Sequence, residues 1–300
     1  MNRGSLKYFI LLVLGMIFWG GSWVSAKIVV ALAPPATVGF FRFLTASVFF
    51  LPLLVTMQWN RLKTLSRRDI GNWCLLGSIG VFGYGILFLI GMQFTTSTQG
   101  SIIAGINPTL VSLLAFVFLK ERLTSRWQYV GYLFSFLGIV FVVGVQTLFE
   151  FRLEYLIGNF ILLCAMLTWG TYSILGKIIM QNRSSLETTA GGIFIGTFLF
   201  FLGAMVEQFW TLPAMVDPSF WVNVLYMGIF VTVLGFLFYF LGLKNLGASH
   251  AAIFISLVPV FGTLFSILLL SEPLYPTFVI GLALVVTGIL VINFPRKSTI

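Results

Sequence analysis

The sequence predicts an all-α integral membrane protein with ten transmembrane helices in two inverted five-helix repeats. Three observations support this prediction. Hydrophobic residues make up 59% of the 300 residues and charged residues only 8%, whereas a soluble domain carries roughly 25% charged residues. Ten apolar stretches follow one another, and a helix needs about 20 such residues to cross a bilayer. The last five stretches repeat features of the first five.

The ten apolar stretches define the expected spans. They are residues 8–30, 35–57, 71–93, 97–119, 126–145, 156–178, 188–210, 220–243, 249–270 and 276–294. Helices are expected because backbone groups in lipid must be satisfied within their own segment, and these runs do not alternate as barrel strands do. The first stretch is too long for the apolar region of a secretory signal, so we expect a retained helix.

The second half of the chain repeats the first. Trp19 and Lys27 in the first stretch return 150 residues later as Trp169 and Lys177 in the sixth. An odd number of spans in each half forces the second half to enter the membrane from the opposite side. We therefore predict one repeat over residues 1–148 and another over 149–300. Inverted repeats of this kind are typical of secondary transporters.

Basic residues between the expected spans predict the orientation. With the N-terminus in the cytoplasm, thirteen Lys and Arg residues fall in cytoplasmic segments and only Arg152 falls in an outer loop. The thirteen are Arg3, Lys7, Arg61, Lys63, Arg67, Arg68, Lys120, Arg122, Arg126, Arg183, Lys244, Arg296 and Lys297. We therefore expect a multi-pass protein of the inner, cytoplasmic membrane with both termini in the cytoplasm.

Composition also argues against several classes of function. The net charge of +9 is spread over short loops rather than clustered, so no nucleic-acid partner is expected. One histidine and two cysteines are too few ligands for a typical metal site, and no phosphate-binding glycine loop occurs. No Asp or Glu lies in the middle of an expected span, where an intramembrane enzyme would need acid or base groups. We expect neither an enzyme nor a cofactor.

Arg42 lies inside the second expected span. Because an ionisable group at mid-bilayer costs roughly 2.5–3.5 kcal/mol on insertion scales, it should face protein or water. One interpretation is a clamp for a substrate carboxylate or phosphate, and the other is an arginine that snorkels or satisfies a helix end. Lys27 and Lys177 are interpreted as snorkelling residues, with a role in gating as the alternative.

Two further features point to transport. His250, the single histidine, opens the ninth expected span, where it could couple transport to protons or serve as an interface or capping residue. Pro108 and Pro259 lie in the middle of the fourth and ninth spans. Each removes a backbone donor and predicts a helix kink. Symmetric broken helices are the best sequence indication of a binding site in repeat transporters.

We predict a substrate-binding site between expected spans one, three, four, six, eight and nine. In addition to Arg42, its candidate lining residues are Trp19, Trp23, Tyr84, Asn107, Trp169, Tyr172, Tyr239, Phe254 and Ser256. Aromatic walls with few polar groups suit a small amphipathic solute. Helix packing would explain several of these residues equally well.

Glycines indicate close helix packing in both halves. They occur as Gly131 and Gly138, Gly281 and Gly288, and the small-xxx-small pair Gly192 and Gly196. Such residues let helices approach closely. The spacing leaves open whether they serve packing within the chain or the seam of a homodimer.

Several ordered motifs carry a family resemblance. They are Trp19-Gly20, Trp169-Gly170, Phe41-Arg42-Phe43, the string from Ser97 through Asn107-Pro108 to Lys120-Glu121-Arg122-Leu123, and the string from Gly247 through Val258-Pro259 to Ser271-Glu272-Pro273-Leu274. With these motifs, the chain resembles the drug/metabolite transporter superfamily with two EamA-type halves, over nearly its whole length.

The resemblance implies ten helices, cytoplasmic termini and alternating access through a central cavity. It also implies small metabolites such as amino acids as cargo, often exported. The prediction is therefore a secondary transporter that exports a small organic metabolite, with that solute and the lipid bilayer as its partners. A lipid flippase, which would need a side opening toward lipid, and a non-transporting membrane receptor are the alternatives.

Overall fold

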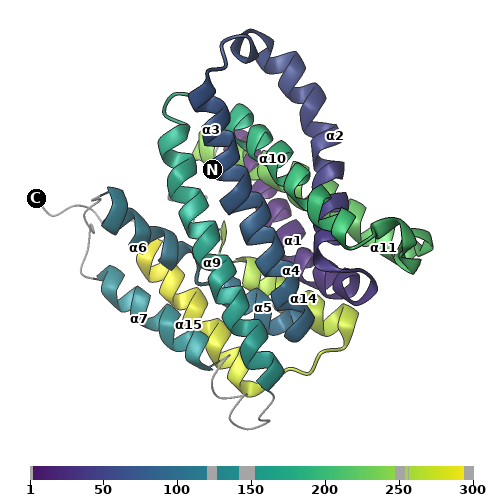
Figure 1. The fold of residues 1–300 in the computed structure, drawn as a ribbon. Coiled ribbons are helices and arrows are strands. Elements are labelled where there is room, and N and C mark those ends of the chain that lie inside the picture. The colour runs from purple at the N-terminus through teal and green to yellow at the C-terminus, as the bar shows by residue number, and fades with distance from the viewer. Residues whose placement is uncertain (1–2, 120–126, 142–152, 247–253, 256, 294–300) are drawn as a thin grey trace, which may run out of the picture.

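A computed structural model describes residues 3–119, 127–141, 153–246, 254–255 and 257–293. Figure 1 shows that the described segments are helical, and no strand occurs among them, so the all-α class is confirmed. The α-helices are α1 (Arg3–Leu32), α2 (Pro35–Leu62), α3 (Arg67–Leu76), α4 (Tyr84–Phe94), α5 (Ser97–Ala104), α6 (Asn107–Leu119), α7 (Trp127–Val140), α9 (Leu153–Ile179), α10 (Ser185–Val206), α11 (Pro218–Leu225), α12 (Gly235–Leu246), α14 (Leu257–Leu270) and α15 (Pro276–Asn293). Two π-helical segments, η1 (Gly77–Gly83) and η5 (Tyr226–Leu234), and two short 3₁₀ turns, η3 (Phe209–Thr211) and η4 (Pro213–Val216), complete the described elements.

The described residues include seven helical segments that are long and apolar enough to cross a bilayer. They are Leu6–Leu32, Pro35–Leu62, Arg67–Phe94, Ser97–Phe118, Leu153–Ile179, Ser185–Val206 and Pro218–Tyr239. Three shorter apolar helices, Tyr129–Val140, Leu257–Leu270 and Pro276–Val291, lie where the fifth, ninth and tenth spans are expected. Large apolar side chains remain on the outside, such as Phe118 (69% exposed) and Leu268 (65%). A lipid solvent explains this exposure, and water does not.

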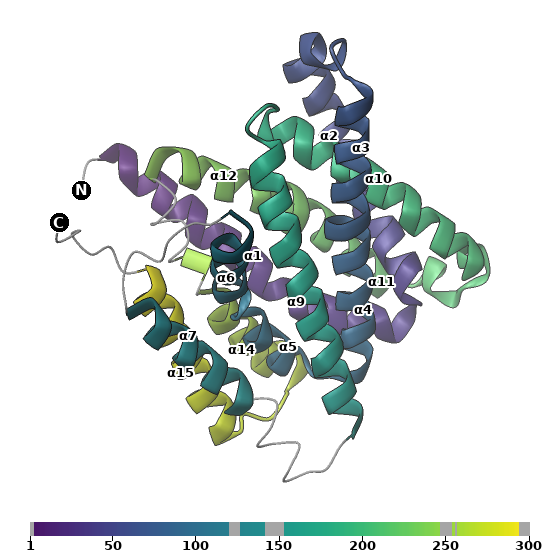
Figure 2. The same ribbon diagram turned by 60° about the vertical axis from the view of Figure 1, so that its left-hand side comes forward.

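Equivalent helices of the two halves pack against each other. α7 packs along α15, and α2 packs along α10; Figures 1 and 2 both show α7 beside α15. Other extensive contacts are also matched, since α1 contacts α12 and α14, and α9 contacts α4 and α6. Exchanging the two halves leaves this set of contacts unchanged. The helices of the two halves therefore form one bundle rather than two separate ones.

Glycines allow the closest of these contacts. A Cβ atom added at Gly138 would lie 2.7 Å from the Gly281 carbonyl oxygen, and one at Gly288 would lie 2.6 Å from that of Gly131. Side chains at these positions would push α7 and α15 apart. The Gly192–Gly196 pair likewise faces η1 and the residue before it. The glycines singled out from the sequence thus serve contacts within the chain, and a homodimer gains no support from them.

Among the described residues, the third, fourth and eighth spans contain irregular segments, and those of the third and eighth are symmetric. The third span passes through η1 and the eighth through η5, at equivalent places in the two halves. Such π-helical turns occur frequently at functional sites. The fourth span ends as α5 at Ala104 and restarts as α6 at Asn107, directly before Pro108. In the ninth span Pro259 lies in the first turn of α14, and most of the preceding residues lie outside the described ranges.

An ion pair ties two connections together at one end of the bundle. Arg183, between α9 and α10, donates from Nη2 to Asp69 Oδ2 at 2.6 Å and from Nε to Oδ1 at 3.0 Å. It also donates to the carbonyl oxygen of Thr64, between α2 and α3, at 2.9 Å. The hydrogen bond with Asp69 raises the pKa of Arg183. The loops after the second and sixth spans therefore share one side of the molecule.

Candidate functional site

A pocket lies among the middle parts of the helices, with walls from both halves. Its lining residues are Arg42, Phe43, Gly80, Val81, Tyr84, Trp169, Tyr172, Thr189, Ile193, Thr232 and Phe236. They come from α2, η1, α4, α9, α10, η5 and α12. The space between these side chains, including the part that is open to solvent, amounts to about 360 Å³.

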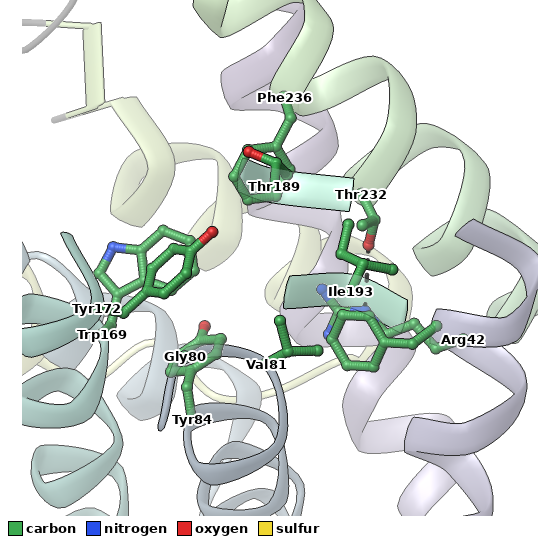
Figure 3. Close-up of a pocket in the computed structure, with 11 residues that line it drawn as sticks. Arg42, Gly80, Val81, Tyr84, Trp169, Tyr172, Thr189, Ile193, Thr232 and Phe236 are labelled. Carbon is green, nitrogen blue, oxygen red and sulfur yellow. Dashed lines mark hydrogen bonds between the residues drawn. The ribbon is translucent and has the colours of Figure 1, made fainter. Parts of the chain in front are cut away.

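Aromatic rings form one side of the pocket. The ring centroid of Trp169 is 4.9 Å from that of Tyr84 and 5.5 Å from that of Tyr172. Phe236 continues the wall, with its ring 6.1 Å from Trp169. Figure 3 shows Trp169 and Tyr172 together on one side, with Tyr84 below them. These rings offer an apolar surface and few polar atoms.

The absence of a side chain at Gly80 brings two walls together. A Cβ atom at this position would overlap the ring of Tyr172. Gly80 lies within η1, so the π-helical segment and α9 meet with no side chain between them. The glycine thereby lets Tyr172 lie directly against the backbone of η1.

Arg42 forms the opposite side. It is only 7% exposed, its Nε donates to Thr232 Oγ1 at 3.4 Å, and its guanidinium carbon lies 4.9 Å from the ring centroid of Phe43. Figure 3 shows Arg42 and Thr232 facing Trp169 and Tyr172 across the pocket. No Asp or Glu is among the lining residues. Within the described ranges, no ion pair compensates the charge of Arg42.

Two further predicted residues lie directly behind this pocket. Trp19 packs on Phe236, with ring centroids 5.6 Å apart, and on Tyr239, with centroids 5.4 Å apart. Its Nε1 donates to the carbonyl oxygen of Val231 in η5 at 3.0 Å. Trp19 and Tyr239 therefore support the pocket wall from outside.

Other predicted residues lie elsewhere. Trp23 is buried in the core against Phe88, with ring centroids 4.9 Å apart, and Phe254 packs on Phe9, with centroids 5.7 Å apart. Asn107 lies at the start of α6, where its Oδ1 is buried and has no hydrogen-bond partner among the described atoms. Ser256 and His250 fall outside the described residues, so the structure says nothing about either prediction.

Several lining residues were not singled out from the sequence. Thr189 and Thr232 bring hydroxyl groups to the pocket, and Phe236 and Ile193 bring apolar surface. In an apolar run each of these residues is typical of helix packing. They lie on α10, η5 and α12, and hydrophobic periodicity does not reveal which residues of these elements share a pocket.

A separate polar cluster fixes the break between α4 and α5. Lys27 Nζ donates to the carbonyl oxygens of Met92 at 2.9 Å and Thr95 at 2.6 Å. Glu272 accepts from the backbone amides of Ser97 and Thr98, both at 2.8 Å. A cation thus satisfies the carboxyl end of α4, and an anion satisfies the amino end of α5, as the helix dipoles favour. Lys27, interpreted from the sequence as a snorkelling residue, is therefore a helix-capping residue.

Comparison with known proteins agrees with the two halves and the membrane-spanning helices. The family described as the EamA-like transporter family matches twice, over residues 6–144 and 156–294. The chain belongs to the EamA-like transporter family. The resemblance to EamA-type members of the drug/metabolite transporter superfamily is thereby confirmed, and with it a multi-pass membrane protein of a transporter family.

Similar proteins are themselves named as transporters. The "Uncharacterized transporter YyaM" of Bacillus subtilis strain 168 is 29% identical over 98% of this chain and 97% of its own length. The "Uncharacterized transporter YetK" of the same organism is 30% identical over 97% of this chain and 88% of its own length. A protein named "Probable terminal-alkyne amino-acid exporter" from Streptantibioticus cattleyicolor is 25% identical over 94% of this chain and 92% of its own length.

A solved structure shows the same fold. One crystal structure aligns with a TM-score of 0.66 and 19% identity, covering 95% of this chain and 96% of its own. Identity at this level speaks for the fold and not for the cargo. The cargo has to be inferred from the pocket of this EamA-family chain.

Proposed function

We propose that this protein is a secondary transporter that moves a small organic metabolite, such as an amino acid, out of the cell. The pocket between Arg42 and Trp169 is its cargo site, and the two halves rock about that site to give alternating access. The protein performs no chemistry on its cargo and needs no cofactor. An amino-acid exporter among the relatives agrees with this class of cargo.

One observation carries the proposal. The pocket takes its walls from both halves, with Gly80, Tyr84, Trp169 and Thr232 all near the middle of their helical segments. In transporters built from inverted repeats, cargo binds near the bilayer midplane at the interface of the repeats. A movement of one half against the other would therefore open the pocket to alternate sides. The π-helical turns η1 and η5 give both halves an irregular helix at this interface.

The architecture that this mechanism needs is ten spans, with repeats over residues 1–148 and 149–300 inverted across the membrane and both termini in the cytoplasm. Single cysteines in place of Arg61, Arg183 and Glu154, in a background without Cys74 and Cys164, test it. An impermeant maleimide added to intact cells should label the position at Glu154 and leave the other two unlabelled until the cells are broken. Labelling of all three from outside would contradict the architecture.

Transport itself is tested in proteoliposomes. Purified protein should exchange members of a labelled panel of amino acids and small organic acids across the bilayer, measured as counterflow with and without a pH gradient. Ile193→Trp would fill the pocket and should abolish the exchange. Phe198→Trp, on the exposed side of the same helix, should preserve it. Equal counterflow by Ile193→Trp and the wild type would remove the pocket from the transport path.

A further inference from the structure

We propose, on the basis of the transport function above, that the pocket narrows the small organic metabolites to monoanions: compact carboxylates with an apolar or aromatic body and no positive charge. This narrower class replaces the amino acids that were given above as one example of the cargo. The juxtaposition that carries this inference is a buried guanidinium facing an aromatic wall, with no Asp or Glu among the described residues that line the pocket. Arg42 would bind the carboxylate, and Trp169, Tyr84 and Tyr172 would hold the body of the cargo.

The charge of Arg42 requires a partner. Its side chain is 7% exposed and lies within a membrane span, where a charged group is costly unless it is paired. Among the described residues, Arg42 donates a hydrogen bond to a neutral hydroxyl, Thr232 Oγ1, contacts the Phe43 ring and lies within electrostatic range of the Tyr84 hydroxyl. None of these groups is an acidic residue. A bound carboxylate would supply both that charge and the acceptors for a bidentate interaction.

The geometry leaves the guanidinium available to a ligand. Nε is engaged by Thr232 at 3.4 Å, whereas Nη1 and Nη2 have no hydrogen-bond partner within the described ranges. Arginine presents a planar fork that matches the two oxygens of a carboxylate. Thr232 holds one edge of the fork and so acts as a positioning residue.

The rest of the lining restricts the remainder of the cargo. A free ammonium group would share the pocket with the positive charge of Arg42, and no Asp or Glu among the described lining residues offsets that repulsion. A phosphate dianion would need more positive charge, and Arg42 is the one basic residue among the lining residues. The aromatic side instead favours a ring or an apolar chain. A single negative charge at one end of a small apolar molecule fits both sides of the pocket.

A set of similar probes tests this selectivity. 3-Phenylpropionate, 3-phenylpropan-1-ol, 2-phenylethylamine and phenylalanine share a phenyl ring and differ in charge. Their affinities are measured by calorimetry on purified full-length protein at pH 7.5. The anion should bind roughly tenfold or more tightly than the alcohol and the zwitterion, as expected for a charge-assisted bidentate pair. The amine should not bind. An alcohol or amine that binds as well as the anion would overturn the inference, as would no binding of the anion.

Variants locate the effect at Arg42. Arg42→Gln should weaken binding of 3-phenylpropionate about tenfold or more while changing the affinity for the alcohol less than about twofold. Arg42→Lys should retain part of the anion affinity, and Thr232→Val should lose a smaller part, because it removes only the hydroxyl that positions the guanidinium. Arg68→Gln, at an exposed position, is the matched control and should bind as the wild type does. Undiminished anion binding by folded Arg42→Gln would refute the role of Arg42.

The binding assay separates this inference from the transport function. If 3-phenylpropionate binds through Arg42 but no probe or metabolite crosses the bilayer, the transport proposal is wrong and the selectivity inference stands. If metabolites undergo counterflow but 3-phenylpropionate neither binds nor competes, the selectivity inference is wrong and the transport proposal stands.

Discussion

Each half contains an equivalent contact between its first helix and a π-helical segment. The two contacts differ in their hydrogen bonds. Where α1 meets η5, Trp19 Nε1 donates to the Val231 carbonyl oxygen at 3.0 Å, and Tyr226 Oη donates to that of Phe18 at 3.0 Å. Where α9 meets η1, Trp169 occupies the position equivalent to Trp19, but it lines the pocket. Hydrogen bonds join α1 to η5, whereas the contact between α9 and η1 borders a cavity.

The repeat thus determines the arrangement of the backbone, whereas a few side chains determine where the cavity lies. The residue equivalent to Tyr226 is Leu76, which has no hydroxyl to donate. The same asymmetry appears between α2 and α10, because Arg42 has Gly192 as its equivalent. Among the described residues, a charged side chain, Arg42, and a tryptophan that lines a cavity, Trp169, therefore occur together at only one of the two equivalent places. The pocket is asymmetric although the helices around it are symmetric.

The largest expected effect on stability is at the contact between α1 and η5. Trp19→Ala should destabilise the protein by about 3–5 kcal/mol, because it removes a packed ring and a hydrogen bond to η5. Trp19→Phe should cost less, about 0.5–1.5 kcal/mol beyond small packing changes, because it mainly removes the bond. The stability of both variants is measured by unfolding in detergent, induced by heating or by SDS titration. Trp210→Ala, at a 55% exposed position, is the control. A stability loss no greater than this control would contradict the fastening role of Trp19.

The equivalent change on the open side should affect binding more than stability. Trp169→Ala removes the ring that contacts Tyr84, Tyr172 and Phe236. An aromatic contact is worth about 0.5–1.5 kcal/mol. Because the variant loses the contact between this ring and the cargo, its cargo affinity should decrease by a factor of a few to about ten or more. The loss of unfolding free energy should be clearly smaller than for Trp19→Ala. The comparison fails if the two tryptophan variants have the same profile of stability and counterflow.

Much of the fold could be predicted from sequence because its physical causes are repeated and simple. Apolar composition requires a lipid solvent, and the offset between Trp19 and Trp169 indicates two like halves. Pro108 predicted an irregular fourth span, which breaks just before it. The ten-span count and the side of the termini are finer statements, which remain predictions for the labelling experiment.

The site could be predicted only in part, because the sequence does not show which face of a helix meets the cavity. Arg42, Tyr84, Trp169 and Tyr172 line the pocket and were selected as polar or aromatic residues in spans. Trp23 was selected on the same ground but packs in the core. The two types of tryptophan position differ by helix rotation and by neighbours from other spans, and a single sequence contains neither.

A moderate effect is expected where the two halves differ at the helix ends. Lys27 Nζ caps α4 through the Met92 and Thr95 carbonyl oxygens, whereas its equivalent Lys177 is exposed in the last turn of α9. Lys27→Met should lower the free energy of unfolding by about 1 kcal/mol, and Lys177→Met should change it by less than about 0.5 kcal/mol, because the contacts of an exposed charged side chain contribute little whatever its partner.

Glu272→Gln tests the other side of the same helix break. It should weaken the capping of α5 by about 0.5–2 kcal/mol, because the carboxylate accepts from two backbone amides. Together with the lysine pair, it is measured by unfolding in detergent at constant pH. If both lysine variants lose equal stability, the Lys27 contacts do not distinguish the halves.

The smallest expected change in stability is at Asn107, whose equivalent in the second half is the apolar Val258. Asn107 Oδ1 is buried and has no hydrogen-bond partner among the described atoms, so Asn107→Leu should change the free energy of unfolding by less than about 1 kcal/mol and can even raise it. We nevertheless expect slower counterflow, because this amide lies at the break between α5 and α6, where rocking of the halves would give it a polar partner. Val258→Leu is the matched control at the equivalent position. Counterflow by Asn107→Leu with wild-type rate and affinity would exclude Asn107 from the cargo path.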